Sequence, residues 1–447
     1  MSRELLRVCV AAIATAAVAV GSIVCGETAP AAATEPRAAS FAEFDRRARA
    51  GESLEVVFFG ASLTWGANAS DPLRTSYRAE IARRLEREYP RARFHFHDAA
   101  IGGTGSQLGV FRMERDVLAH DPDLVFLDFS ANDGISSKDP ETLASYEAIL
   151  RRLIAGSRCP VVQVIFPFKW DVAANSTAGM TRRDAHLALA AAYGTAAGDA
   201  ITLAIDRVGR GETTLEKIWP VDGVHPCDEG YQLFADAAWE AFREAVGENR
   251  VCRAPAAMLH ADTYTQAVRQ PLFKHEPLPK GWHAGRPNLT SAFFDFLMSR
   301  WLDGVAIATR PPAAPGQELP PQPERLQARF TGRMVMVLGE TTKASGKYRV
   351  WIDGAPVEHV SPWTQEKSDL FDVGAFAQRI GGNGHHGQVV ATGLDGTVEH
   401  LLEIEPVLEP GQELRLESLC IAGPGAAVTL ATSGSQPGRT GDQAVGK

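Results

Sequence analysis

Residues 54–66 read LEVVFFGASLTWG, an apolar run that ends in Gly60 and is followed at once by Ser62. This stretch predicts a short buried strand with a serine just beyond its carboxyl end. Further candidate strands lie at 94–100, 124–129 and 161–168, and candidate helices at 77–89, 142–155, 182–193 and 230–246. Such alternation predicts an α/β domain with helices on both faces of a parallel sheet.

The second half of the chain has a different sequence pattern. Residues 311–323 contain six prolines, which predicts an extended linker. Beyond it come short alternating runs such as 348–352, which predict an all-β domain, either a sandwich or a jelly roll. Beyond residues 1–33, the predicted organisation is a spacer at 34–52, the α/β domain at 53–253, a connecting segment at 254–324, the β domain at 325–430 and a disordered tail at 431–447.

The first 33 residues have the pattern of a targeting segment. Arg3 and Arg7 precede an uncharged stretch at 8–26, and small residues follow it. This pattern predicts a signal peptide over 1–33 and export to the periplasm or the extracellular space. An uncleaved anchor and a lipid-modified Cys25 remain alternatives.

Composition narrows the range of partners. The 447 residues include 45 Lys and Arg against 54 Asp and Glu, a formal net charge of -9. An acidic chain without a basic run is a poor binder of nucleic acid, because that affinity rests on cations that neutralise phosphates. We expect no nucleic-acid partner and no stable membrane span once the leader is removed. The oligomeric state stays open.

Cysteine and histidine spacing gives no support to a metal or cofactor. The cysteines beyond the leader contain no CxxC pair. Cys227 and Cys252 could form a disulfide or stay as buried thiols. The adjacent His385 and His386 diverge if they lie in a strand, and no third ligand is indicated. We therefore predict no metal and no cofactor.

Three further segments carry chemistry. The glycines in 100–105, AIGGTG, allow backbone N–H groups to approach a ligand closely, and Asn132 in 129–133, FSAND, offers an amide donor. In 222–226, DGVHP, a carboxylate three residues before a histidine can orient the imidazole and leave its other nitrogen free as a base.

The order Ser62, Gly103, Asn132 and Asp222 with His225 resembles the SGNH (GDSL) hydrolase family over roughly residues 50–250. The resemblance implies a flavodoxin-like three-layer α/β fold and a Ser-His-Asp hydrolase. Ser62 would be the nucleophile, His225 the general base and Asp222 its orienting carboxylate. The N–H groups of Ser62 and Gly103 and the side chain of Asn132 would form the oxyanion hole, with Gly102 as the alternative to Gly103.

The chain departs from the family pattern at two places. It has Ala61 where the family has the aspartate of GDS, and Ser130 where the family has the glycine of GxND. Neither position transfers a proton in the implied mechanism. We expect an intact mechanism with altered loop support or substrate preference.

Export and a β-rich second domain favour an acylated, most simply acetylated, carbohydrate as substrate, since jelly-roll-like modules accompany some carbohydrate esterases of this family. Trp170 and Trp363 are candidates to stack on sugar rings, although packing in the core or at the rim is the favoured interpretation of each. The alternatives are a short-chain lipase or lysophospholipase, an acyltransferase, and a non-catalytic glycan-binding or scaffold protein on a degenerate hydrolase fold.

Overall fold

The structure is a computed structural model that describes residues 38–135, 139, 141–292, 301–360, 365–380 and 383–431. The predicted signal peptide at 1–33, Trp363 and all but the first residue of the predicted tail lie outside these residues. The described residues form one structural unit.

A five-stranded parallel sheet forms the N-terminal half, in the order β2-β1-β3-β4-β5. Its strands are β1 (Ser53–Gly60), β2 (Arg93–Ala100), β3 (Leu124–Leu127), β4 (Val161–Ile165) and β5 (Ala196–Asp199). The centre of the sheet is buried on both faces, which explains why β1, β3 and β4 are nearly continuous apolar runs. The α/β prediction is confirmed.

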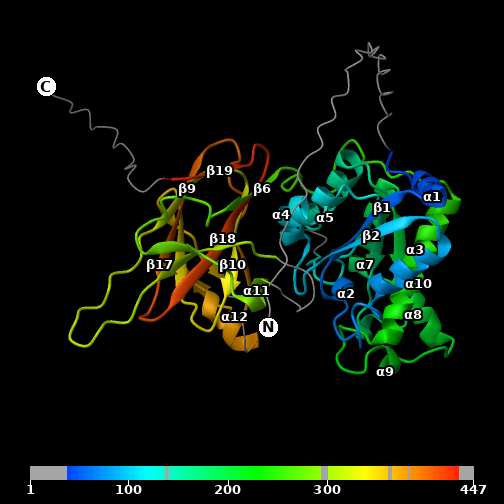
Figure 1. The fold of residues 1–447 in the computed structure, drawn as a ribbon, viewed down its shortest axis with the longest axis horizontal. Coiled ribbons are helices and arrows are strands. Elements are labelled where there is room, and N and C mark those ends of the chain that lie inside the picture. Colours follow the sequence, from blue (N-terminus) through cyan, green and yellow to red (C-terminus); the bar gives the residue numbers. More distant parts are fainter. Residues whose placement is uncertain are drawn as a thin grey trace, which may run out of the picture. The chain divides into compact units, whose positions relative to one another are not determined.

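Helices cover both faces of this sheet (Figure 1). One group is α1 (Phe41–Ala50), α3 (Tyr77–Glu88) and α10 (Asp228–Gly247), and the other is α4 (Ser106–Asp116), α5 (Ala144–Arg151) and α7 (Thr181–Tyr193). Shorter helices are α2 (Ser62–Trp65), α6 (Lys169–Ala173), α8 (Ala200–Gly209) and α9 (Leu215–Ile218). Tyr77, Ile81 and Leu85 of α3 are buried, as their four-residue spacing predicts.

Strand β5 was not predicted from the sequence, because Ala-Ala-Gly-Asp has neither β-branched nor large apolar side chains. Its small residues are a packing requirement. A Cβ on Gly198 would lie 2.9 Å from the Cα of Ala238 in α10, so the helix backbone rests directly on the strand. Only tertiary packing makes this segment a strand.

The C-terminal half is built from antiparallel strands in two six-stranded sheets, which confirms the prediction of a β-rich region. The first contains β6 (Ala267–Pro271), β7 (Trp282–Gly285), β8 (Val305–Thr309), β10 (Met334–Thr341), β16 (Gly384–Ala391) and β18 (Glu413–Ala422). The second contains β9 (Leu326–Thr331), β11 (Lys347–Ile352), β12 (Ala355–Pro356), β15 (Phe371–Asp372), β17 (His400–Val407) and β19 (Ala427–Leu430). The short β13 (His359–Val360) and β14 (Lys367–Ser368) pair with each other, and the helices of this half are α11 (Leu289–Ala292) and α12 (Val373–Ile380).

Both six-stranded sheets contribute to one apolar core, for example Val337 from the first and Tyr348 and Val350 from the second. The segment 254–324, predicted as a connection, supplies β6, β7 and β8 to the first sheet. These strands are short and their sequences lack clear alternation, so their pairing with β18 and with each other is what makes them strands.

The four cysteines in the described part of the chain are free thiols, so the disulfide alternative for Cys227 and Cys252 is not realised. Cys227 caps the start of α10 and Cys252 follows its end. A helix of 20 residues is about 30 Å long. The two thiols therefore lie near opposite ends of α10. No helix among the described residues is long and apolar enough to cross a membrane.

Candidate active site

Ser62 is the first residue of α2, two residues after the end of β1. The turn is tight, because a Cβ on Gly60 would lie 2.2 Å from Oγ1 of Thr64 and 2.5 Å from the carbonyl oxygen of Asp128. Glycine is thus required for the chain to pass beside β3. The turn places Ser62 at the carboxyl edge of the sheet, where open α/β folds carry their sites.

The structure brings Ser62, His225 and Asp222 into one hydrogen-bonded chain. The Nε2 atom of His225 lies 3.0 Å from Oγ of Ser62, and its Nδ1 atom lies 3.2 Å from Oδ2 of Asp222. The other carboxylate oxygen, Oδ1, accepts the backbone N–H groups of Val224 and His225, both at 2.7 Å. Although partial burial acts to raise the pKa of Asp222, these donors outweigh it and hold the pKa below its ordinary value. The carboxylate therefore stays charged beside the imidazole.

Asn68 also contacts this carboxylate, although no sequence pattern singles it out. Its Nδ2 atom donates to Oδ2 of Asp222 at 2.9 Å and to the carbonyl oxygen of His225 at 3.3 Å. Its backbone is left-handed, with φ of 67°. Asparagine tolerates that conformation better than most residues. An Asn six residues after the serine is the only sequence signal, and it is too common to stand out.

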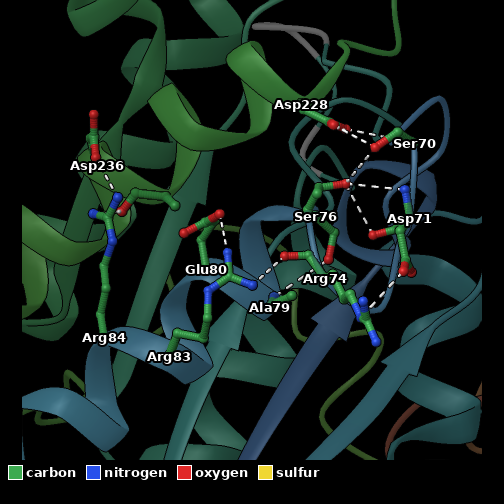
Figure 2. Close-up of polar contacts among 12 residues, drawn as sticks. Ser70, Asp71, Arg74, Ser76, Ala79, Glu80, Arg83, Arg84, Asp228 and Asp236 are labelled. Carbon is green, nitrogen blue, oxygen red and sulfur yellow. Dashed lines mark hydrogen bonds and ion pairs between the residues drawn. The ribbon is translucent and has the colours of Figure 1, made fainter.

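The loop that carries Asn68 is tethered to the start of α10. The carboxylate of Asp228 accepts the backbone N–H of Ser70 at 2.8 Å and the hydroxyl of the same residue, and Figure 2 shows the two side chains facing each other. The hydroxyl of Tyr231 donates to the carbonyl oxygen of Ala67 at 2.7 Å. The loop after Ser62 is thus joined to the start of α10, which directly follows the loop with His225, by side chains from each segment.

Gly103 and Asn132, the predicted oxyanion donors, line one cavity of about 590 Å³. Gly103 is exposed with φ of 71°, a conformation that favours glycine, whereas Gly102 is buried. Gly103 is therefore the one of the pair that reaches the cavity. The loops that carry Gly103 and Asn132 follow β2 and β3, which flank β1 in the sheet. The turn with Ser62 emerges between them.

The remaining candidates fall at different places. Trp170 is exposed on α6, stacks on Phe168 with ring centroids 4.6 Å apart, and lies against Gly223 of the loop that carries the histidine. It is therefore at the rim of the site. Trp363 lies outside the described residues.

The paired histidines diverge. The Nε2 atom of His386 lies 2.9 Å from the hydroxyl of Tyr348, while the ring of His385 packs edge-on against Trp301. Burial lowers the pKa of each to about 4, so both are neutral near pH 7. The described residues contain no group of three or more His, Cys, Asp or Glu arranged to hold a metal ion.

Residues 58–233 match the GDSL-like lipase/acylhydrolase family. This region belongs to that family. No curated protein matches the chain. Two crystal structures of a two-domain esterase (CEX) active on acetylated mannans, one of them co-crystallised with mannopentaose, are each 21% identical to it. Each match covers 85% of this chain and 94% of the esterase chain, with TM-scores of 0.67 and 0.66. At this identity the likeness shows a shared fold, an α/β domain followed by a β-rich region.

The two departures of this GDSL-like domain from its family pattern have structural explanations. Ala61 is fully buried in the apolar core, so an aspartate there would be desolvated. Ser130 is also fully buried, and its hydroxyl donates to Oδ1 of Asp128 at 2.9 Å and accepts the N–H of Phe166 at 3.1 Å. The carboxylate of Asp128 further accepts the hydroxyl of Thr64 from α2 at 3.3 Å. A buried aspartate thus supports the nucleophile turn from β3.

Arg112 supports the same turn from α4. It is buried, and its guanidinium donates to the carbonyl oxygens of Ala99 at 2.6 Å and Gly60 at 2.9 Å. Burial lowers its pKa to about 10, which still leaves it charged near pH 7, and Asp116 lies 3.1 Å away as its counter-ion. The ends of β1 and β2 in this GDSL-like domain are therefore held together by one cation.

Proposed function

We propose that this chain is an exported serine esterase that removes acyl groups, most simply acetyl groups, from a carbohydrate. The observation that carries the proposal is the hydrogen-bonded chain from Ser62 through His225 to Asp222. A serine hydroxyl is a weak nucleophile that needs an adjacent base, and the base needs a partner that fixes its orientation. The family of residues 58–233 supports the choice of reaction, and the activity of the matched two-domain esterase on acetylated mannans supports the choice of substrate.

The reaction proceeds in two halves. Oγ of Ser62 attacks the ester carbonyl carbon while Nε2 of His225 takes the hydroxyl proton. The oxyanion that forms is stabilised by N–H groups and by the amide of Asn132. His225 then gives the proton to the departing sugar oxygen, which leaves an acyl-serine. A water molecule loses a proton to His225 and attacks that ester, which releases the carboxylic acid and restores Ser62.

A second candidate, a short-chain lipase or lysophospholipase, is favoured by one observation. Trp170 and Val221 are 56% and 77% exposed and border the loop with Asp222 and His225. Such apolar side chains at the rim would suit an acyl chain. Acyl-chain preference therefore separates the two candidates, and a non-catalytic glycan-binding protein would turn over neither class of ester.

The experiment is hydrolysis of aryl acetate, butyrate and octanoate by the purified protein and by Ser62→Ala. We expect turnover of acetate to exceed that of octanoate, and Ser62→Ala to lower kcat on the order of 10⁴-fold or more. Ser53→Ala, an exposed serine at the start of β1, is the matched control and should retain full activity. Preference for octanoate would favour the lipase, and negligible rates in all three proteins would contradict the esterase. Acetate release from acetylated polysaccharides then tests the carbohydrate itself.

The proposed location is outside the cytoplasm, on the strength of the leader pattern at 1–33. Cell fractionation with N-terminal sequencing of the mature protein tests it. A cytoplasmic protein that retains Met1 would contradict export, and a fatty-acylated Cys25 at the mature N-terminus would show a lipoprotein.

A further inference from the structure

The carboxyl group of Asp128 connects the turn that carries the nucleophile to the turn that carries the oxyanion asparagine. Asp128 follows the end of β3 directly and is fully buried. Its Oδ2 atom accepts the hydroxyl of Thr64 at 3.3 Å, and Thr64 lies two residues after Ser62 in α2. Its Oδ1 atom accepts the backbone N–H of Ser130 at 3.0 Å and the hydroxyl of that residue at 2.9 Å. One carboxyl group therefore bridges the two turns.

The second of these turns reaches the oxyanion hole within two residues. The backbone N–H of Asn132 donates to the carbonyl oxygen of Phe129 at 2.9 Å, which closes a turn with Ser130 inside it. The hydroxyl of Ser130 also accepts the N–H of Phe166 at 3.1 Å, and Phe166 follows the end of β4. Ser130, which stands where the family has a glycine, therefore fastens the Asn132 turn both to Asp128 and to the neighbouring strand.

The turn with Ser62 needs an anchor from outside itself. Helix α2 has only four residues, so it has few hydrogen bonds of its own. Position 61, where the family has an aspartate, is Ala61, whose side chain neither donates nor accepts a hydrogen bond. Thr64 supplies a polar side chain instead, and it is fully buried beside β3 because Gly60 has no Cβ to keep it away. The contact between Thr64 and the carboxyl group from β3 is such an anchor.

The bridge persists whether or not the carboxyl group holds a proton. Burial raises the pKa of Asp128 to about 7, against the Ser130 and Thr64 hydrogen bonds that lower it. A hydroxyl group can donate to a carboxylate or, after rotation, accept from a carboxylic acid. A proton on Oδ2 therefore reverses the contact with Thr64 without breaking it.

We propose that Asp128 is a positioning residue that fixes the hydroxyl of Ser62 relative to the amide of Asn132. This role rests on the proposed esterase function, in which the ester carbon meets Ser62 while the ester oxygen meets Asn132. Asp128 itself touches none of the reacting atoms. A misplacement of about 1 Å between reacting groups can cost 10²-fold in rate. Because the oxyanion forms only in the transition state, poorer alignment lowers kcat and leaves KM nearly unchanged.

The test is hydrolysis of aryl acetate by Thr64→Val, which keeps the shape of the side chain but removes its hydroxyl. We expect kcat to fall about ten-fold with KM within about two-fold, and Thr64→Ser to recover most of kcat. The matched control is Thr195→Val. Thr195 is a buried threonine just before β5, at the opposite edge of the sheet, and its hydroxyl accepts the amide of Gln163 at 2.6 Å. It should lose stability in urea as Thr64→Val does but keep its kcat. An unchanged kcat in Thr64→Val, an equal loss in Thr195→Val or no recovery in Thr64→Ser would overturn the role.

The other oxygen of the bridge is tested by Ser130→Ala. Since loss of either contact opens the bridge, Thr64→Val combined with Ser130→Ala should lower kcat by much less than the product of the two separate losses. Losses that multiply would mean two independent contacts and would overturn the bridge. Asp128→Asn should keep most of kcat, because its amide accepts from Ser130 and donates to Thr64. A large loss in Asp128→Asn would mean that the charge matters and the bridge does not.

Reaction of Ser62 with diisopropyl fluorophosphate separates this role from the proposed function. The serine oxygen bonds to phosphorus and fluoride leaves, while His225 takes the hydroxyl proton, so the reaction needs the same alignment but no ester substrate. Mass spectrometry of the modified protein gives its rate. Absent turnover of aryl acetate with modification slowed only in Thr64→Val would refute the esterase and support the positioning role. Turnover with equal modification rates in the wild type, Thr64→Val and Thr195→Val would overturn the positioning role. A wild type that shows neither reaction would overturn both.

Discussion

At the scale of single residues, Asn68 positions the carboxylate of Asp222, which in turn orients the imidazole of His225. Its amide occupies the same oxygen of Asp222 that faces Nδ1 of His225, and it also holds the carbonyl oxygen of His225. The carboxylate side chain is 41% exposed, so without this amide it would be free to turn toward water. Asn68 is a positioning residue that does not touch the reacting atoms.

We predict that Asn68→Gly lowers kcat for aryl acetate by about ten-fold, because a hydrogen bond to a charged group is worth roughly 1.5–3 kcal/mol. Glycine accepts the left-handed backbone, so the melting temperature should change little. The control is Asn249→Gly, another left-handed asparagine, with φ of 53°, beyond the end of α10. An equal loss of activity in both variants, or none in Asn68→Gly, would contradict the assigned role.

Asp128 couples stability to pH. Burial raises its pKa from 3.8 to about 7, despite the Ser130 and Thr64 hydrogen bonds that lower it. The folded protein therefore holds this proton more tightly than the unfolded chain. The contribution is fully present below the unfolded pKa and is lost as pH rises through about 7. The carboxylate of Asp128 also acts to raise the pKa of Arg182. That guanidinium is already paired with Asp171.

We predict that Asp128→Asn gains stability relative to the wild type as pH rises from 4.5 to 8, by about 2–4 kcal/mol in the free energy of unfolding. Urea denaturation at the two pH values measures this difference. Asp206→Asn, an exposed aspartate on α8, should show no such pH dependence. An Asp128→Asn effect of the same size at both pH values would show that the buried carboxyl does not titrate in this window.

At the scale of elements, α4 ties the ends of β1 and β2 together through Arg112. The guanidinium spans the carbonyl oxygens of Gly60 and Ala99 and lies over the ring of Phe59, 4.6 Å from its centroid. Since Gly60 begins the turn to Ser62, this contact links the helix to the geometry of the nucleophile.

We predict that Arg112→Met lowers the free energy of unfolding by about 2–4 kcal/mol, because two buried carbonyl oxygens lose a charged donor and Asp116 loses one of its cations. Urea denaturation measures the loss, and activity should fall with it. Arg87→Met on the exposed face of α3 serves as the control and should change stability by less than about 0.5 kcal/mol. A similarly small change in Arg112→Met would mean that water replaces the guanidinium.

At the scale of the whole molecule, the α/β region and the first β sheet share one apolar core. Met334, Met336 and Leu338 of β10 and Cys420 of β18 belong to the same buried cluster as the strands of the parallel sheet. The α/β region thus buries part of its apolar surface only because the β strands are present.

We therefore predict that residues 38–253 expressed alone expose an apolar patch, aggregate and melt at a lower temperature than the full chain. Size-exclusion chromatography and thermal melting measure this, and co-expression of residues 254–447 should restore the soluble form. A monomeric fragment with the melting temperature of the full chain would show that the two regions are energetically independent.

The sequence by itself determined the features that depend on local pattern. Buried strands such as β1 and β3 were predictable because apolar runs between helical periods have few other solutions. Ser62 and His225 were predictable as partners from the resemblance of their motifs to the SGNH family, since the loop that carries His225 follows the short helix α9 and not a strand. The alternation of Tyr348, Val350 and Ile352 likewise predicted which face of β11 is buried, and all three are buried.

Tertiary structure alone decided the rest, because those features depend on contacts between residues far apart in the chain. Strand β5 exists because α10 packs on Gly198, and β6 exists because β18 offers it an edge. Asn68 lies 154 positions from Asp222, and no local pattern encodes that hydrogen bond. Short-range periodicity fixes which elements form, while long-range packing fixes which side chains meet.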